Sequence, residues 1–318
     1  MNNLKKIGMT ALAASLVSTS VFAGELGVTG AASINFENHS GTANSEPKTF
    51  SMGNQMTFTG GGELDNGITV SLSMVIDNDE TNLDAQSVTI SSDAMGTLKF
   101  SGEGGASTAS SIGTSVGGNM WDNFNGTTGN TPLSGTSVSN SLAGDNSFFY
   151  TLPSMGVDGL AVMASFDPQT ATTASEIGYG LTYTGVDGLT ASYATSAVET
   201  YAATTTGDES VWKLSYAMGS FTLAASNSEY NLGAATSNHE VTSYKVSYTV
   251  SDALSVSYKT DEVKTAATSS VNGEFEGFSA SYTAGGMTVS ANMQEGKNIA
   301  NTASAAVDYY GLGLSFAF

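Results

Sequence analysis

The sequence has 318 residues, a formal net charge of −20 and no cysteine, so disulfide bonds contribute nothing to its stability. All nine basic residues are lysines, against 29 Asp and Glu residues. Nucleic acid is a polyanion, so this strongly acidic composition excludes it as a partner.

The first 23 residues have the pattern of a secretory signal peptide. Lys5 and Lys6 precede an apolar run, and a small-residue cleavage site ends at Ala23. A membrane anchor is the alternative, but the apolar run is too short to span a bilayer. We therefore expect residues 1–23 to be removed and residues 24–318 to form one domain. Removal takes two lysines and no acid, so seven lysines and 29 acids leave a net charge of −22.

After the leader, the chain is a series of short segments in which every second residue is apolar. Such alternation places the apolar side chains on one face of a β-strand. No stretch reaches the eighteen or so apolar residues of a membrane-spanning helix. We count about sixteen expected strands, an even number, as a closed single-chain barrel requires. They begin near residues 26, 50, 68, 88, 98, 148, 160, 177, 189, 212, 221, 244, 254, 278, 287 and 307.

The connections between these strands alternate in length. Short ones fall at residues 64–67, 93–96, 155–159, 185–188, 218–220, 251–253 and 285–286, with longer ones between them. Short turns at one end and long loops at the other are typical of outer-membrane β-barrels. A soluble β-sandwich would also explain the alternation, but aromatic residues near the strand ends favour a barrel with an aromatic girdle.

The positions of the lysines also favour a membrane barrel. A lysine that faces lipid near the midplane costs about 2–4 kcal/mol, so a barrel should keep its lysines on the lumen side. Four lysines take the polar phase of their strands: Lys99, Lys213, Lys245 and Lys259. Glu276 and Asp308 instead share the phase of their apolar neighbours, but both lie at the loop end of their strands, where the cost falls or a bulge shifts the phase.

Residues 101–147 form a connection much longer than the others. Long loops within a compact domain are usually functional or disordered. It contains four large apolar residues that could anchor it against a wall: Met120, Trp121, Phe124 and Leu133. Such anchors favour a loop folded into the barrel. Its acids Glu103, Asp122 and Asp145 are candidates to line a constriction, with solvated loop charges as the alternative.

The long third loop after TLKFSG, together with the ending YYGLGLSFAF, resembles the general diffusion porins of Gram-negative bacteria, in their alphaproteobacterial branch. The resemblance implies a trimeric, sixteen-stranded outer-membrane β-barrel that passes small hydrophilic solutes, with the third loop folded inward. It also implies that Phe318 belongs to an assembly signal. Porins of this family set a cluster of basic residues, largely arginine, opposite acids of the third loop. This chain has no arginine, so the four lumen-phase lysines are its candidate substitutes.

The acidic lumen expected from this charge balance predicts mild cation selectivity. Lipopolysaccharide and lipid are the other expected partners. A second acidic stretch could hold Ca²⁺ through Asp77, Asp79, Glu80 and Asp84, but it lacks the glycine and terminal glutamate of an EF-hand, so a solvated loop is the simpler interpretation. No cofactor is expected.

Catalysis has little support in the sequence. His39 and His239 are the only histidines, and no nucleophile motif accompanies them. We therefore expect a channel and not an enzyme. An outer-membrane structural or adhesion protein, with its surface loops as the working part, is the alternative function.

Overall fold

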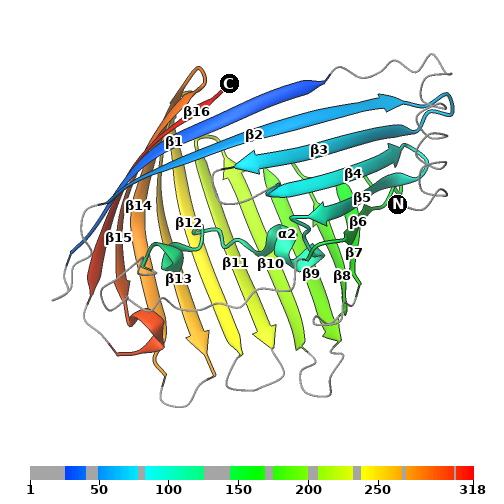
Figure 1. Cartoon of the computed structure of the whole chain (residues 1–318). Helices are drawn as coiled ribbons and strands as arrows, with labels where there is room; N and C mark the ends of the chain where they lie inside the picture. The colour runs from blue at the N-terminus through cyan, green and yellow to red at the C-terminus, as the bar shows by residue number, and fades with distance from the viewer. Residues whose placement is uncertain are drawn as a thin grey trace, which may run out of the picture.

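The computed structural model describes residues 26–40, 49–77, 83–124, 144–168, 175–199, 207–231, 238–266, 270–303 and 306–318. Neighbouring strands in the sequence pair antiparallel, and β1 pairs with β16 to close a sixteen-stranded barrel (Figure 1). The expected barrel is therefore confirmed. The proposed leader, Asp79, Glu80 and Leu133 lie outside the described residues.

The strands match the alternating segments of the sequence. They are β1 (Gly27–Ser40), β2 (Thr49–Glu63), β3 (Thr69–Asp77), β4 (Ala85–Ser92), β5 (Gly96–Glu103), β6 (Ser147–Thr151), β7 (Leu160–Asp167), β8 (Ser175–Tyr183), β9 (Leu189–Glu199), β10 (Gly207–Met218), β11 (Phe221–Asn231), β12 (His239–Ser251), β13 (Leu254–Thr265), β14 (Gly273–Ala284), β15 (Met287–Lys297) and β16 (Val307–Ala317).

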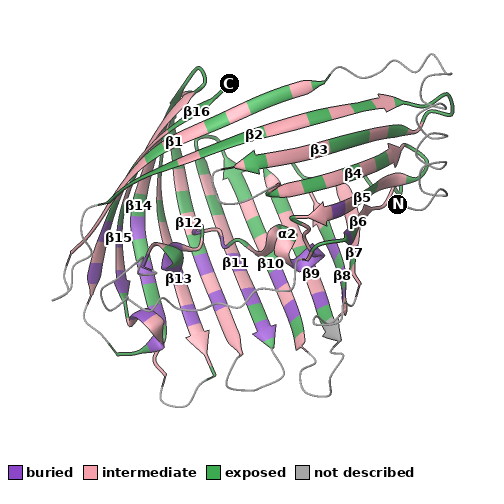
Figure 2. Cartoon of the chain, in the orientation of Figure 1, coloured by how far each residue is buried: buried purple, intermediate pink, exposed green. Residues whose placement is uncertain are grey.

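The apolar phase of the strands faces outward. Leu214 on β10 and Leu312 on β16 are exposed, and Phe278 on β14 is 64% exposed. In Figure 2, buried residues gather instead on the loop-side halves of β8 to β16, where a segment inside the barrel packs against them. A continuous exposed apolar band of this kind needs an apolar medium, such as the hydrocarbon of a lipid bilayer.

Two short helical segments, α2 (Thr108–Gly113) and η1 (Met120–Phe124), lie within the ring of strands (Figure 1). Both belong to the connection from β5 to β6, which we call L3. A third short segment, η3 (Ile299–Asn301), follows β15. In the part of the chain that the structure describes, no helix is long and apolar enough to cross a membrane. L3 thus folds inward, as the anchors Met120, Trp121 and Phe124 predicted.

The seam between the first and last strands runs from the pair Ala31–Ala317 to the pair Ser40–Asp308. Beyond it, the Gly30 N–H donates to the Phe318 carbonyl oxygen at 2.6 Å, and the Phe318 N–H donates to the Gly30 oxygen at 2.9 Å. A Cβ on Gly30 would lie 2.3 Å from Phe318 Cε2. Glycine at this position therefore makes room for the terminal aromatic ring.

Glu276 and Asp308, which share the outward phase of their apolar neighbours, lie on the loop side of a row of large apolar residues. That row crosses β13 to β16 and consists of Tyr258, Phe278, Met293 and Tyr310. The next row toward the loops pairs Glu276 with Glu295 and Glu295 with Asp308. The aromatic row marks the edge of the apolar band, so these carboxylates lie outside the hydrocarbon, where their cost is small.

Candidate functional site

L3 is fastened to the lumen wall through a series of serine hydroxyls. The Thr108 N–H donates to Ser165 Oγ on β7 at 2.9 Å, and the Ala109 N–H donates to Ser196 Oγ on β9 at 3.4 Å. Ser107 caps α2 by accepting from the Ser110 N–H at 3.0 Å. β7 and β9 thus each provide one serine hydroxyl to a backbone donor of L3, which satisfies these groups and fixes the course of the loop.

The series continues on β11 and β12. The Val116 N–H donates to Ser226 Oγ on β11 at 3.0 Å, and the Gly117 N–H donates to Ser243 Oγ on β12 at 2.8 Å. The backbone lies so close to the wall here that a Cβ on Gly117 would approach Asp261 Oδ1 to 2.2 Å. A side chain at Gly117 would therefore displace either the loop or the Asp261 carboxylate.

Asp261 on β13 is the charged anchor of L3. Its side chain is 2% exposed. Oδ1 accepts from the Ser115 hydroxyl at 3.0 Å, and Oδ2 accepts from the Met120 N–H at 2.8 Å. Ser243 also bonds to this carboxylate. Hydrogen bonds to a charged acceptor are the stronger class, so this one side chain holds the start of η1 in place.

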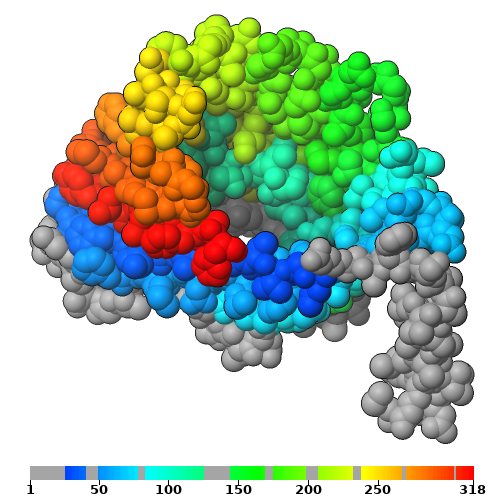
Figure 3. Space-filling view, turned by 90° about the horizontal axis from the view of Figure 1, so that it is seen from above, coloured from blue at the N-terminus to red at the C-terminus, as the bar shows by residue number. Residues whose placement is uncertain are grey.

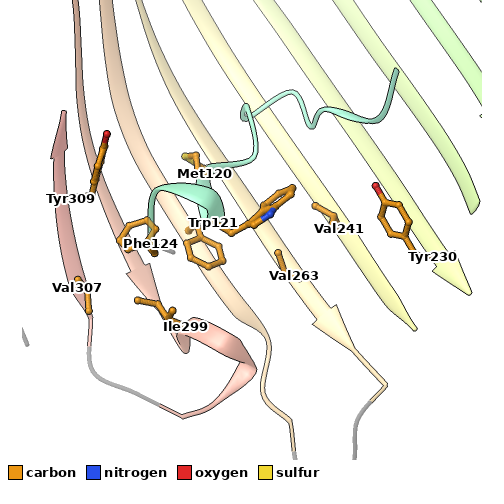
Figure 4. Close-up of a cluster of buried hydrophobic side chains, with 10 residues drawn as sticks. Met120, Trp121, Phe124, Tyr230, Val241, Val263, Ile299, Val307 and Tyr309 are labelled. Carbon is orange, nitrogen blue, oxygen red and sulfur yellow. The ribbon is translucent and has the colours of Figure 1, made fainter. Parts of the chain in front are cut away.

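The end of the described part of L3 is held by apolar packing. Figure 4 shows the η1 side chains Met120, Trp121 and Phe124 directed at the wall. All three are buried in one cluster with residues of β11 to β14, β16 and η3: Tyr230, Val241, Val263, Phe275, Ile299, Val307 and Tyr309. The cluster lies inside the barrel, so burying it gives L3 a hydrophobic attachment independent of the lipid.

L3 finally reaches the first strand. The Asn123 side chain donates to Gln294 Oε1 on β15 at 2.8 Å, and its backbone oxygen lies 2.6 Å from His39 Nε2 on β1. The His39 ring also packs against Phe124 and Tyr309 at centroid distances of 6.0 and 5.1 Å. The loop therefore follows the wall from β7 round to β1.

The opposite side of the bore has a different surface. In the middle of β1 to β4, the lumen-phase side chains are hydroxyls and amides: Ser33, Asn35, Ser51, Gln55, Thr57, Ser71, Ser73 and Thr89. We call these residues the facing wall. The space-filling view shows the central opening, with the atoms of L3 inside it (Figure 3). The passage is thus bounded by L3 on one side and by an uncharged polar surface on the other.

The four candidate lysines all lie in the lumen phase. Lys99 is opposite Thr89, and Lys213 is opposite Ser226. Lys245 and Lys259 lie directly opposite each other on β12 and β13. Lys259 lies close to L3, because a Cβ on Gly118 would lie 3.9 Å from its Nζ. Lys213, Lys245 and Lys259 are on the wall that holds L3, so they do not face the loop across the bore.

The three candidate acids of L3 are dispersed. A bulge places Glu103 opposite Gln86, outside the lumen phase of β5. Asp145 lies at the root of L3, beside Gly144, whose Cβ would lie 2.2 Å from Asp167 Oδ2. Of the three, only Asp122, on η1, lies on the part of L3 that follows the wall inside the barrel.

The environment of Asp122 favours its neutral form. Partial burial in the bore and the nearby charge of Asp261 raise the pKa of Asp122, and a hydrogen bond from Asn119 opposes them. Its charge is therefore lost at a higher pH than that of an ordinary aspartate.

The metal candidates remain apart from this site. Asp77 ends β3 and Asp84 lies just before β4, while the other two members of the stretch are not described. Within the described ranges, no group of three or more His, Asp or Glu residues is placed to hold a metal ion.

The anchoring residues were not among the sequence candidates. Ser165, Ser196, Ser226 and Ser243 are ordinary polar-phase serines in a chain rich in serine. Asp261 offered one signal, a carboxylate in the lumen phase two residues after Lys259. Its role depends on where L3 meets the wall, which strand periodicity does not reveal.

Comparison with known proteins agrees with this architecture. The sequence profile described as Gram-negative porin matches residues 8–278. The structure is similar to the anion-selective porin from Comamonas acidovorans, with a TM-score of 0.69, 14% identity and coverage of 93% of this chain and 100% of that chain. A refined porin structure gives a TM-score of 0.67 and 17% identity, and a variant of Rh. blastica porin gives 0.63 and 14%; each covers 92% of this chain and 100% of the other. Curated protein sequences give no significant match.

Proposed function

The chain belongs to the Gram-negative porin family and forms an outer-membrane channel for diffusion, and on that premise we propose a channel with a mild preference for cations that works as a homotrimer. The observation that best supports a diffusion channel is the course of L3. Its described part narrows the bore from one wall, and the facing wall carries hydroxyl and amide side chains.

This arrangement explains how solutes pass without a tight binding step. Hydroxyls and amides replace part of a solute's hydration shell, but they hold ions more weakly than charged groups do. L3 is attached at several strands, so it acts as a fixed size limit. Swelling of liposomes that contain the protein tests this idea. We expect the swelling rate to fall steeply as the neutral sugar becomes larger, and equal rates for small and large sugars would contradict a fixed L3.

The cation preference is proposed from the charges of the bore. Several carboxylates that are not buried lie along L3 or in the lumen phase at the loop ends of strands, among them Glu37, Asp77, Asp122 and Asp167. A negative mouth concentrates cations and repels anions. The similar Comamonas porin is anion-selective, so the fold alone does not determine the sign. A zero-current potential in a salt gradient measures it, and anion preference in this protein would refute the proposal.

Lys99 gives a specific test of this charge balance. It is exposed in the lumen phase of β5, near the root of L3. Lys99→Glu should raise the cation-to-anion permeability ratio, because it replaces a positive charge with a negative one beside the passage. An unchanged ratio would mean that Lys99 does not contribute to selectivity.

The remaining proposals concern assembly. Residues 1–23 are an export signal, residues 24–318 are the barrel domain, and Phe318 is part of the signal that directs insertion. Its ring is 75% exposed on the outer surface, where another protein could contact it. The mass of the detergent-solubilised protein, corrected for bound detergent, tests the trimer. A mass of one chain would contradict it. We assign no enzymatic activity and no resident cofactor.

A further inference from the structure

Three lumen lysines form a group on the turn side of L3. Lys213 shares a cross-strand row with Ser226 and Ser243, which hold L3. Lys245 on β12 and Lys259 on β13 form the next lumen-facing pair toward the short turns, two residues along each strand from Ser243 and Asp261. The distance along a strand between such positions is about 6.6 Å, and neighbouring strands are about 4.8 Å apart, so flexible lysine side chains from all three can approach one point.

These lysines lack ion-pair partners in the described part of the chain. The ion pairs found there belong to Lys264, with Glu240 and Glu262, and to Lys297, with Glu295. Those groups are in the outward phase of β12 to β15. The nearest lumen carboxylate, Asp261, already accepts bonds from Ser115 and Met120. The basic group is therefore only partly compensated by protein charge.

The pairing of Lys245 with Lys259 is unfavourable by itself, because like charges directly opposite on neighbouring strands repel. Both side chains are half-buried beside L3, so water screens them less than it screens surface lysines. An anion between the two ammonium groups would relieve this repulsion. Serines 247 and 257, the next lumen-phase pair toward the turns, add hydroxyl donors beside it.

We propose that Lys245 and Lys259, with Lys213 beside them, form a binding site for a small multivalent oxyanion, with inorganic phosphate as its simplest ligand. This inference rests on the proposed channel function. Solutes that carry such a group pause directly after the constriction, on the wall that holds L3, while neutral solutes pass along the facing wall. The chain thus combines an acidic loop side with one local anion site.

Phosphate block of single-channel current tests the site. The protein is inserted in a planar bilayer in about 0.1 M KCl at a pH where phosphate is a dianion, and millimolar phosphate is added. We expect a saturable decrease in potassium conductance, because the bound anion occupies part of the passage. The decrease should weaken at about 1 M KCl, where screening is strong.

Matched variants separate the site from net charge. Lys245→Gln/Lys259→Gln should lose the phosphate-induced decrease, and Lys245→Arg/Lys259→Arg should keep it. Lys264→Gln/Lys297→Gln removes the same charge from the outer face and should respond like the unchanged protein. If the double glutamine variant does not fold, the two single glutamine variants should each show a weaker decrease.

The outcomes also separate this inference from the channel function. If no steady conductance is seen at all, the channel proposal fails. If the conductance is normal but phosphate has no effect on it, or has the same effect on the double glutamine variant, the anion site is refuted and the channel stands.

Discussion

Asp261→Ala should release L3 without opening the barrel. The substitution removes the acceptor of the Met120 N–H at 2.8 Å and of the Ser115 hydroxyl at 3.0 Å. A bond to a charged group contributes about 1.5–3 kcal/mol, so the two together contribute roughly 3–6 kcal/mol. The substitution also removes the desolvation cost of a buried carboxylate, which offsets part of this loss. The free energy of docking L3 on the wall should therefore weaken by roughly 2–4 kcal/mol.

Such a loss raises the population of detached L3 by roughly 30- to 800-fold, because each 1.4 kcal/mol is a factor of ten. The barrel should remain closed, since its ladder of backbone bonds does not involve the Asp261 side chain. Single-channel recording should therefore show a larger mean conductance with more current noise, and the melting temperature of the barrel should change little.

Glu262→Ala provides the matched control. Glu262 is the next residue on β13, points to the outer face and pairs with Lys264 at 3.3 Å. Its removal should leave conductance and noise unchanged. If Asp261→Ala also left both unchanged, or if it unfolded the barrel instead, the idea that this carboxylate fixes L3 would be wrong.

Three further predictions concern single residues. Gly117→Ala should displace L3 and change the conductance, because its Cβ would lie 2.2 Å from a carboxylate oxygen of β13, whereas Gly113→Ala has nothing within 4 Å and should not. Gly30→Leu should lower the melting temperature of the barrel, since even a Cβ there lies 2.3 Å from the ring of Phe318; an unchanged melting temperature would show that the ring moves aside at no cost. As the pH falls, cation preference should decrease, and Asp122 should lose its charge first because its pKa is raised. In the Asp122→Asn variant, the decrease should therefore begin only at a lower pH. Zero-current potentials of the unchanged protein and of Asp122→Asn, measured from neutral to acidic pH, would check this. Identical pH profiles of the zero-current potential would contradict it.

The barrel was predictable because each strand contains its own signal. Alternation in a run such as Ile68 to Ile76 assigns two faces without knowledge of any other strand, and the short turns then dictate antiparallel neighbours. The lumen phase of Lys99 and Lys213 followed in the same way. Even the exceptions, Glu276 and Asp308, lie at the loop ends where sequence reasoning put them.

The details of the constriction were not predictable, because they depend on contacts between distant segments. Ser115 meets Asp261 across 146 residues of sequence, and no local pattern relates the two. Glu103 leaves the lumen phase through a bulge of one residue, which alternation does not anticipate. Alternation also does not reveal that the ring of Phe318 lies where a side chain on Gly30 would be.

The central claim is that a water-filled bore, narrowed by L3, runs through a barrel whose outer surface lies in lipid. Single-channel recording of the purified protein in a planar bilayer with a salt gradient tests it most directly. We predict discrete, steady current steps that increase with salt concentration and reverse at a potential of the cation-selective sign. Protein that inserts into the bilayer yet gives no steady current would contradict the claim.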